Sequence, residues 1–172
     1  MDAFLAIASR REVRDYTSDP VSEEALQRIL EAGRIAGSGR NWQPCRFIVI
    51  ETRGVLDALA PAVSRSTNLL WAPLAVAIVV SGPGPLAFDG GRAAQNMMLA
   101  AWNDGIGGCP NGITDEPLAR EVLAIEPESK IQTVISFGHP LPEREKPDAR
   151  SPEEWLARAK RLSLDELVIA RI

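Results

Sequence analysis

GSGRNWQPCRFIV, residues 37–49, joins the end of a helical pattern to a strand through a polar turn. The Gly-Ser-Gly step at 37–39 ends the helix, because glycine accepts positive φ and serine competes for backbone hydrogen bonds. Asn41 and Gln43 then place two carboxamides two residues apart, and each can donate and accept. Such a pair suits a planar ligand with ring carbonyls and N–H groups. Amides that tie down their own loop give the same pattern, so the turn alone leaves both interpretations open.

The composition is that of an ordinary soluble globular chain. It has 172 residues, of which 45% are hydrophobic and 24% charged, and its formal net charge is -4. This length is enough for one domain with a real core, so we expect a single domain over residues 1–172. The negative net charge argues against a nucleic-acid partner. Any anion site must therefore be a local cluster of arginines.

Residues for metal or triad chemistry are scarce. Cys45 and Cys109 lie far apart without metal-type spacing, and His139 is the single histidine, so we expect no metal site and no Ser-His-Asp triad. The N-terminal run lacks the order of a signal peptide, and the longest apolar run, Leu74–Val80, is too short to span a bilayer. These features predict a cytoplasmic protein with free thiols and no membrane partner.

Apolar patterning predicts an α+β fold. Strands are expected over Phe47–Glu51, Leu74–Val80 and Ile131–Phe137, because each run is apolar on both alternating faces. The run Leu74–Val80 should be central and covered on both sides. Helical patterns with their caps are predicted over 2–9, 23–36 with Ser22 as N-cap, 55–60, 89–103, 115–124 with Thr114 as N-cap, and onward from Ser151-Pro152. The glycine-rich segment 105–112 is expected to be a loop that lets backbone approach a ligand.

A second stretch adds to the polar turn. RREVRDY, residues 10–16, carries three arginines and an aromatic, and it is followed by Pro20-Val21 and a helix. Together, residues 10–50 resemble the opening of the FMN-dependent nitroreductase family. That opening has an arginine cluster, an aromatic, a proline-valine step, a helix, a small-residue turn, N-x-Q-P and a strand. The resemblance recurs at Asp89–Gly108 and Gly138–Trp155.

The resemblance implies both a fold and an activity. The fold would be nitroreductase-like, with a central mixed or antiparallel sheet flanked by helices, in an intertwined homodimer with FMN at the interface. The apolar run Leu167–Ala170, which has no obvious partner in its own chain, suits a dimer. The activity would pass hydride from NADH or NADPH through FMN to a nitroaromatic, a quinone or a similar small-molecule acceptor. The flavin carries this chemistry, so no catalytic side chain is expected.

Other functions on the same fold stay open at this point. Relatives remove halogen from aromatic substrates or consume the flavin itself, and a non-catalytic flavin-binding module is a further alternative. A deazaflavin could also replace FMN. The sequence does not distinguish NADH from NADPH.

The resemblance implies that three groups of residues bind the cofactor. The N-terminal arginines and one C-terminal arginine would hold the FMN phosphate, since guanidinium groups match phosphate oxygens. The polar turn would touch the flavin ring and ribityl chain, and the glycine segment would bring backbone near the reactive N5. The residues implied are Arg10, Arg11, Arg14, Ser38, Asn41, Gln43, Asn111, Gly112 and Arg150.

Two positions depart from the family pattern. Glu12 stands where the family often has serine, and a carboxylate beside a phosphate is unfavourable unless it turns away. Asp148 stands where a second basic residue is common, and Lys146 is the nearby substitute. His139 is interpreted as a structural loop residue.

Overall fold

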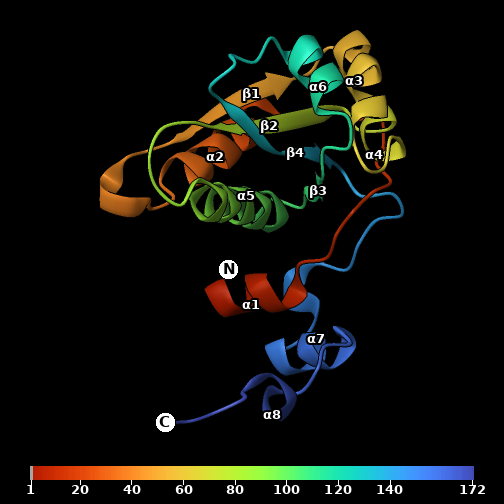
Figure 1. The fold of residues 1–172 in the computed structure, drawn as a ribbon. Coiled ribbons are helices and arrows are strands. Elements are labelled where there is room, and N and C mark those ends of the chain that lie inside the picture. Colours follow the sequence, from red (N-terminus) through yellow and green to blue (C-terminus); the bar gives the residue numbers. More distant parts are fainter. Residues whose placement is uncertain (1) are drawn as a thin grey trace. The chain divides into compact units, whose positions relative to one another are not determined.

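The apolar run Leu74–Val80 forms strand β2 in the computed structural model, which describes residues 2–172 (Figure 1). All seven residues of β2 are buried. The strand pairs antiparallel with β1 (Cys45–Ile50) on one side and with β4 (Lys130–Gly138) on the other. A fourth strand, β3 (Gly107–Asn111), pairs antiparallel with β4, which gives the order β1-β2-β4-β3. The predicted central strand and antiparallel sheet are confirmed.

Both faces of the sheet carry a hydrophobic core. Alternate residues of β2 point to opposite faces, as the period of a strand requires. One face, with Val76 and Ile78, packs against the long helices α2 (Glu23–Arg34) and α5 (Leu86–Asn103). The other face, with Ala75 and Ala77, packs beneath shorter helical segments. Those segments are α3 (Arg53–Leu59), the 3-10 turn Ala60–Ala62, α4 (Thr67–Leu70) and α6 (Glu116–Leu123).

The caps of the helices follow from local sequence. The Ser22 hydroxyl accepts a hydrogen bond from Ala25 N at 3.2 Å and begins α2 as predicted. At α6 the prediction was wrong, because Asp115 rather than Thr114 is the N-cap, and it accepts from Leu118 N at 3.0 Å. The Thr114 hydroxyl donates instead to Ala62 O.

Segment 107–111 is a strand and not the loop predicted from its glycines. An added Cβ on Gly107 would lie 2.5 Å from Val13 Cβ, and one on Gly108 would lie 2.9 Å from Phe137 Cε1. Glycine is therefore required here by close packing inside the sheet. Sequence patterning could not reveal this, since glycine and proline are depleted in most strands.

The described chain divides into two compact units, residues 11–144 and a smaller one of residues 2–10 with 145–172. The smaller unit contains α1 (Ala3–Ser9), the 3-10 turn Pro147–Ala149, α7 (Pro152–Arg158) and α8 (Leu164–Leu167). Helix α1 packs against α7, and α7 begins with the predicted capping box of Ser151 and Glu154. In residues 2–172 no helix combines the length and apolar character that crossing a bilayer requires.

Candidate functional site

The polar turn after α2 has an unusual backbone. Arg40, Asn41 and Gln43 have φ values of 46°, 57° and 52°, so three non-glycine residues within four positions lie in the left-handed region. Such residues cost free energy and tend to gather at functional sites. The Ser38 hydroxyl stabilises the turn by accepting a hydrogen bond from Gln43 N at 2.9 Å. The turn is thus held in one shape by its own side chains.

Asp89 ties this turn to helix α5. Its side chain is buried, with 2% of the residue exposed, and it accepts a hydrogen bond from Gly39 N at 3.3 Å. The carboxylate lies in the first turn of α5, where the helix macrodipole favours a negative charge. Arg92, one turn further along, approaches it to 4.0 Å. No sequence pattern predicted this role for Asp89.

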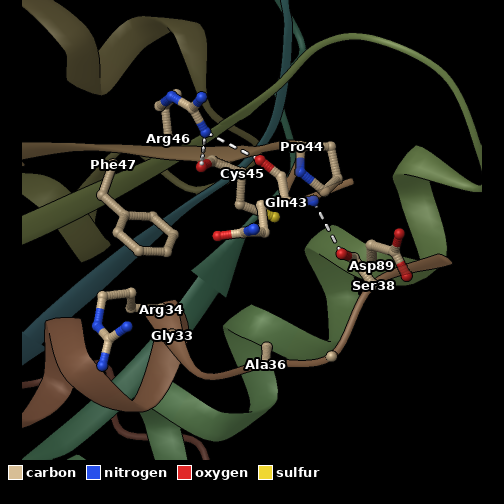
Figure 2. A pocket seen from close by; sticks show the side chains of 11 residues that line it. Gly33, Arg34, Ala36, Ser38, Gln43, Pro44, Cys45, Arg46, Phe47 and Asp89 are labelled. Carbon is tan, nitrogen blue, oxygen red and sulfur yellow. Dashed lines mark hydrogen bonds between the residues drawn. The ribbon is translucent and has the colours of Figure 1, made fainter. Parts of the chain in front are cut away.

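A pocket of about 120 Å³ opens between the end of α2, this turn and the start of β1 (Figure 2). We call it the amide pocket, after the Gln43 carboxamide. Its lining residues are Gly33, Arg34, Ala36, Gly37, Ser38, Gln43, Pro44, Cys45, Arg46, Phe47 and Asp89. Arg46 fixes one wall by donating to Gln43 O at 2.9 Å and to Cys45 O at 2.8 Å. The pocket combines an amide, an aromatic ring and two guanidinium groups.

Cys45 is a free, half-buried cysteine that lines the amide pocket. Burial raises the pKa of the Cys45 thiol, and the negative charge of Asp89 raises it further, while Arg46 acts in the opposite direction. The thiol therefore stays protonated at neutral pH, and protonated thiols are poor nucleophiles. Cys45 serves as a small apolar wall of the amide pocket.

A second pocket, of about 320 Å³, gathers residues from distant segments of the larger unit. We call it the arginine pocket. Its lining residues are Glu12, Arg14, Asp15, Arg65, Thr67, Trp71 and Arg144. Three guanidinium groups outnumber the two carboxylates, and the Trp71 indole, 55% exposed, provides an aromatic wall. Glu12 thus faces the same space as Arg14.

The end of β3 is fixed by a buried network of polar side chains. Asn111 is 1% exposed, and its side-chain nitrogen donates to Cys109 O and Val134 O, each at 3.0 Å. The nitrogen of Asn68 donates to the Asn111 side-chain oxygen at 2.6 Å. Gly112 follows, and its carbonyl accepts from Ser64 N at 2.8 Å. The Asn111 side chain is therefore used inside the protein, and the backbone carbonyl of Asn111 accepts from the Thr133 hydroxyl at 3.0 Å.

The structure brings together some of the predicted site residues. Ser38 and Gln43 line the amide pocket, whereas Asn41 lies in the turn without lining it. Arg14 lines the arginine pocket, and Arg11, in the same unit, is half-buried.

Arg10 and Arg150 belong to the smaller unit. Arg150 donates to Glu145 at 3.0 Å, and its guanidinium lies 5.8 Å from the centre of the Trp155 ring. Lys146 and Asp148 lie at the start and within the 3-10 turn that precedes Arg150. The roles assigned to these residues stay predictions.

Other residues of these pockets were not identified from the sequence. Arg65, Thr67 and Trp71 surround the single turn α4, in a segment without useful patterning, and Arg144 lies in a charged loop. No local motif joins these positions. Only the tertiary fold brings them together around Arg14.

Comparison with known proteins now adds to this geometry. The chain matches the sequence profile of the nitroreductase family over residues 7–81 and 85–139. It belongs to the nitroreductase family. This confirms the resemblance seen in the opening segment.

Individual relatives of this nitroreductase-family chain extend over its length. A protein of Archaeoglobus fulgidus, provisionally named an NADH dehydrogenase/NAD(P)H nitroreductase, is 30% identical over 173 residues and covers 90% of this chain and 99% of its own. A solved structure of a Desulfovibrio desulfuricans nitroreductase in complex with FMN has a TM-score of 0.84 and 29% identity, covering 100% of this chain and 98% of that one. A Bacteroides thetaiotaomicron protein of similar name has a TM-score of 0.79 at 28% identity, over 86% of this chain and 91% of that one.

Proposed function

We propose that this chain is an FMN-dependent oxidoreductase that takes hydride from NADH or NADPH and passes it to a nitroaromatic, a quinone or a similar small-molecule acceptor. The observation that carries the proposal is the likeness, over the whole chain, to a nitroreductase in complex with FMN. The name of the Archaeoglobus relative supports NAD(P)H as the donor. The proposal defines the acceptor by class alone.

The residues of the amide pocket fit the edge of a flavin ring. Gln43 offers a donor and an acceptor to ring N–H and carbonyl groups. The Ser38 hydroxyl accepts from Gln43 N, so its own hydrogen is available to a ligand. Because the turn is already held in a strained backbone, these groups are positioned before a ligand arrives. When bound, FMN would supply the hydride chemistry, and the protein would orient it.

The arginine pocket suits the charged part of an FMN molecule. Arg14 offers a forked guanidinium, which suits phosphate oxygens. Glu12 on the same pocket opposes a phosphate, so the site would not be purely attractive. With Asp15 included, the pocket has three guanidinium groups and two carboxylates, so its formal charge is still positive.

One chain supplies only part of a flavin site. At about 120 Å³ the amide pocket is smaller than the roughly 300–1,000 Å³ usual for small-molecule sites. Trp42 and Phe88, on the turn and at the start of α5, are 41% and 66% exposed. We propose that a second copy of the chain covers these aromatics and completes the site, giving a homodimer with FMN at its interface.

The first test is the colour of the purified protein. We expect a flavin absorption spectrum, loss of that absorption when NADH or NADPH is added without oxygen, and its return when a quinone is added. Steady oxidation of the nicotinamide with a quinone or nitroaromatic would support the reductase. A flavin-loaded protein that instead removes halogen from an aromatic substrate would favour the specialised alternative. A colourless protein that takes up no added FMN would contradict the proposal.

The second test is the affinity for FMN of the Arg14→Ala variant. Loss of a charge-assisted hydrogen bond to the cofactor should weaken binding by roughly tenfold to a hundredfold. The loss should shrink as salt is added, since the pocket is open to solvent. Arg161→Ala is the matched control, because Arg161 is exposed and lines neither pocket. Equal FMN affinity in both variants at low salt would show that Arg14 does not bind the cofactor.

A further inference from the structure

The arginine pocket joins three guanidinium groups, and the two carboxylates of Glu12 and Asp15 line the same space, so one positive charge is left in excess. Arg14, Arg65 and Arg144 come from three segments far apart in sequence. Within residues 2–172 none of the three forms an ion pair within 4.0 Å. Like charges gathered around one space repel each other, and a bound anion would relieve that repulsion.

Several arginines elsewhere in this chain form ion pairs with carboxylates. Arg28 contacts Asp104 at 2.8 Å, Arg53 contacts Asp57 at 2.8 Å, and Arg120 contacts Glu116 at 3.0 Å. Arg150, which the family resemblance places in the phosphate clamp, donates twice to Glu145 and lies against Trp155. Among the described residues Arg40, Arg46 and Arg161 also form no ion pair, so the arginine pocket differs in bringing three such guanidinium groups to one space.

The fold holds the wall of the arginine pocket around α4 in place. Arg53 donates to Ala72 O at 3.0 Å and to Leu69 O at 2.7 Å, which fixes the end of α4 between Arg65 and Trp71. Buried backbone carbonyls held in this way resist movement of the turn. The lining residues of this wall are thus carried on a clamped element and not on a free loop.

The other walls of the pocket are the N-terminal segment and the loop that contains Arg144, and backbone hydrogen bonds hold both. Val13 N donates to Gly108 O at 3.3 Å, which docks the segment carrying Glu12 and Arg14 onto β3. Leu141 N donates to Asp15 O at 2.8 Å, which brings the loop containing Arg144 to the same place. Backbone hydrogen bonds thus bring Arg14 and Arg144 to the pocket, and the Arg53 side chain holds the segment that carries Arg65 and Trp71.

We propose that Arg65 and Arg144, together with Arg14, bind the oxyanion of a phosphate monoester carried by a nucleotide. Guanidinium forks match phosphate oxygens, and Trp71 offers a flat wall to the organic part of the ligand. Two nucleotides of the proposed function carry such a group: FMN at its ribityl end, and NADPH at its 2′ position. The inference rests on the proposed function for its ligands. It assigns to Arg65 and Arg144 a role that the family resemblance gave to Arg150.

The test compares phosphorylated and unphosphorylated ligands in the full-length protein. Variants Arg65→Gln and Arg144→Gln are stripped of flavin and titrated with FMN and with riboflavin, which lacks the phosphate, by quenching of flavin fluorescence. We expect each variant to lose roughly tenfold to a hundredfold in FMN affinity while its riboflavin affinity is unchanged. Arg161→Gln is the control, and Arg150→Gln should have a smaller effect because Glu145 already occupies that guanidinium.

The remaining outcomes each decide the proposal. If flavin binding is unchanged but KM rises for NADPH and not for NADH, the oxyanion is that of the dinucleotide. Equal losses for FMN and riboflavin would show that the arginines hold the ring, and this would overturn the proposal. No change with any of these ligands would overturn it as well.

A second readout separates this inference from the proposed activity. Inorganic phosphate should raise the Tm of the wild-type protein, and raise it less in the Arg65→Gln and Arg144→Gln variants. A protein that takes up no flavin yet shows this phosphate effect would refute the proposed function and leave the oxyanion site standing. Absence of the phosphate effect, with flavin binding intact and unaltered by the variants, would refute the site alone.

Discussion

The Tyr16 hydroxyl joins the N-terminal segment to strand β4 through buried hydrogen bonds. Tyr16 is 6% exposed, and its hydroxyl donates to Val13 O at 2.6 Å and lies 2.9 Å from the Ser136 hydroxyl. The sequence predicted Tyr16 only as the aromatic of a family pattern. Its hydrogen bonds place it between the N-terminal segment and β4, so it secures the wall of the arginine pocket that carries Arg14.

Replacing Tyr16 with Phe should destabilise the protein by about 1–3 kcal/mol, because Val13 O is left buried without this donor. Equilibrium unfolding in urea measures the change. Ser136→Ala provides a double-mutant cycle, and the combined variant should lose less than the sum of the two single losses, since both remove the same interaction. Strict additivity would mean that the two hydroxyls do not interact.

The same residue predicts a pH dependence. Burial raises the pKa of Tyr16 above its ordinary value near 10. The unfolded chain therefore loses the phenol proton first as pH rises, so the free energy of unfolding should fall above about pH 10. Tyr16 is the single tyrosine of the chain, which allows a direct measurement by ultraviolet absorption. Tyrosinate should appear together with unfolding, and ionisation of the intact protein near pH 10 would contradict the buried position.

At the scale of elements, the sequence predicted the strand that is determined by a continuous apolar run. Leu74–Val80 is a strand with the predicted bounds, since seven apolar residues in succession need cover on both faces. Segment 107–111 was missed because its strand depends on partners from Val13 and β4, and not on its own propensity. The turn α4 was missed for a related reason: Arg53 holds it from another helix.

The glycine at position 107 offers an element-scale test. Gly107→Ala would drive a methyl group against Val13, whose β-branched side chain is 1% exposed and cannot turn away. We expect a loss of about 1–3 kcal/mol in stability. Thermal and urea unfolding would both detect it.

Gly91 provides the matched control. It lies on the exposed face of α5 with no atom within 4 Å of an added Cβ. Gly91→Ala should stabilise the protein by about 0.5–1 kcal/mol, since glycine disfavours a helix interior. Similar effects of the two substitutions would contradict the close packing of Val13 on β3.

At the scale of the whole molecule, only some residues of the candidate site can be recognised from a short motif in the sequence. Ser38 and Gln43 were predictable because they lie five positions apart in one short motif. Arg65, Trp71 and Arg144 were not, because backbone pairing between distant segments brings them to Arg14. A short motif can be recognised in one chain, whereas a pocket assembled by tertiary contacts requires the structure.

The proposed homodimer gives the prediction at this scale. Leu164, Leu167 and Ile169 of the smaller unit are 76%, 56% and 98% exposed, so the apolar run that includes α8 is uncovered in a single chain. Sedimentation should give the mass of a dimer at micromolar concentration. Removing residues 163–172 should shift the protein toward monomers, while a variant with Glu166→Gln should remain dimeric. A stable, flavin-loaded monomer of the full chain would contradict the dimer.

The central place of β2 has a consequence for synthesis on the ribosome. Its apolar residues need β1 on one side and β4 on the other, and β4 is translated last. The ribosome needs roughly 3 to 12 seconds to add the residues between Val80 and Gly138 at usual rates of synthesis. During that interval one edge of a fully apolar strand is without its partner. Nascent chains that stop before residue 130 should therefore remain sensitive to protease and bind chaperones, and protection should appear once β4 has left the exit tunnel.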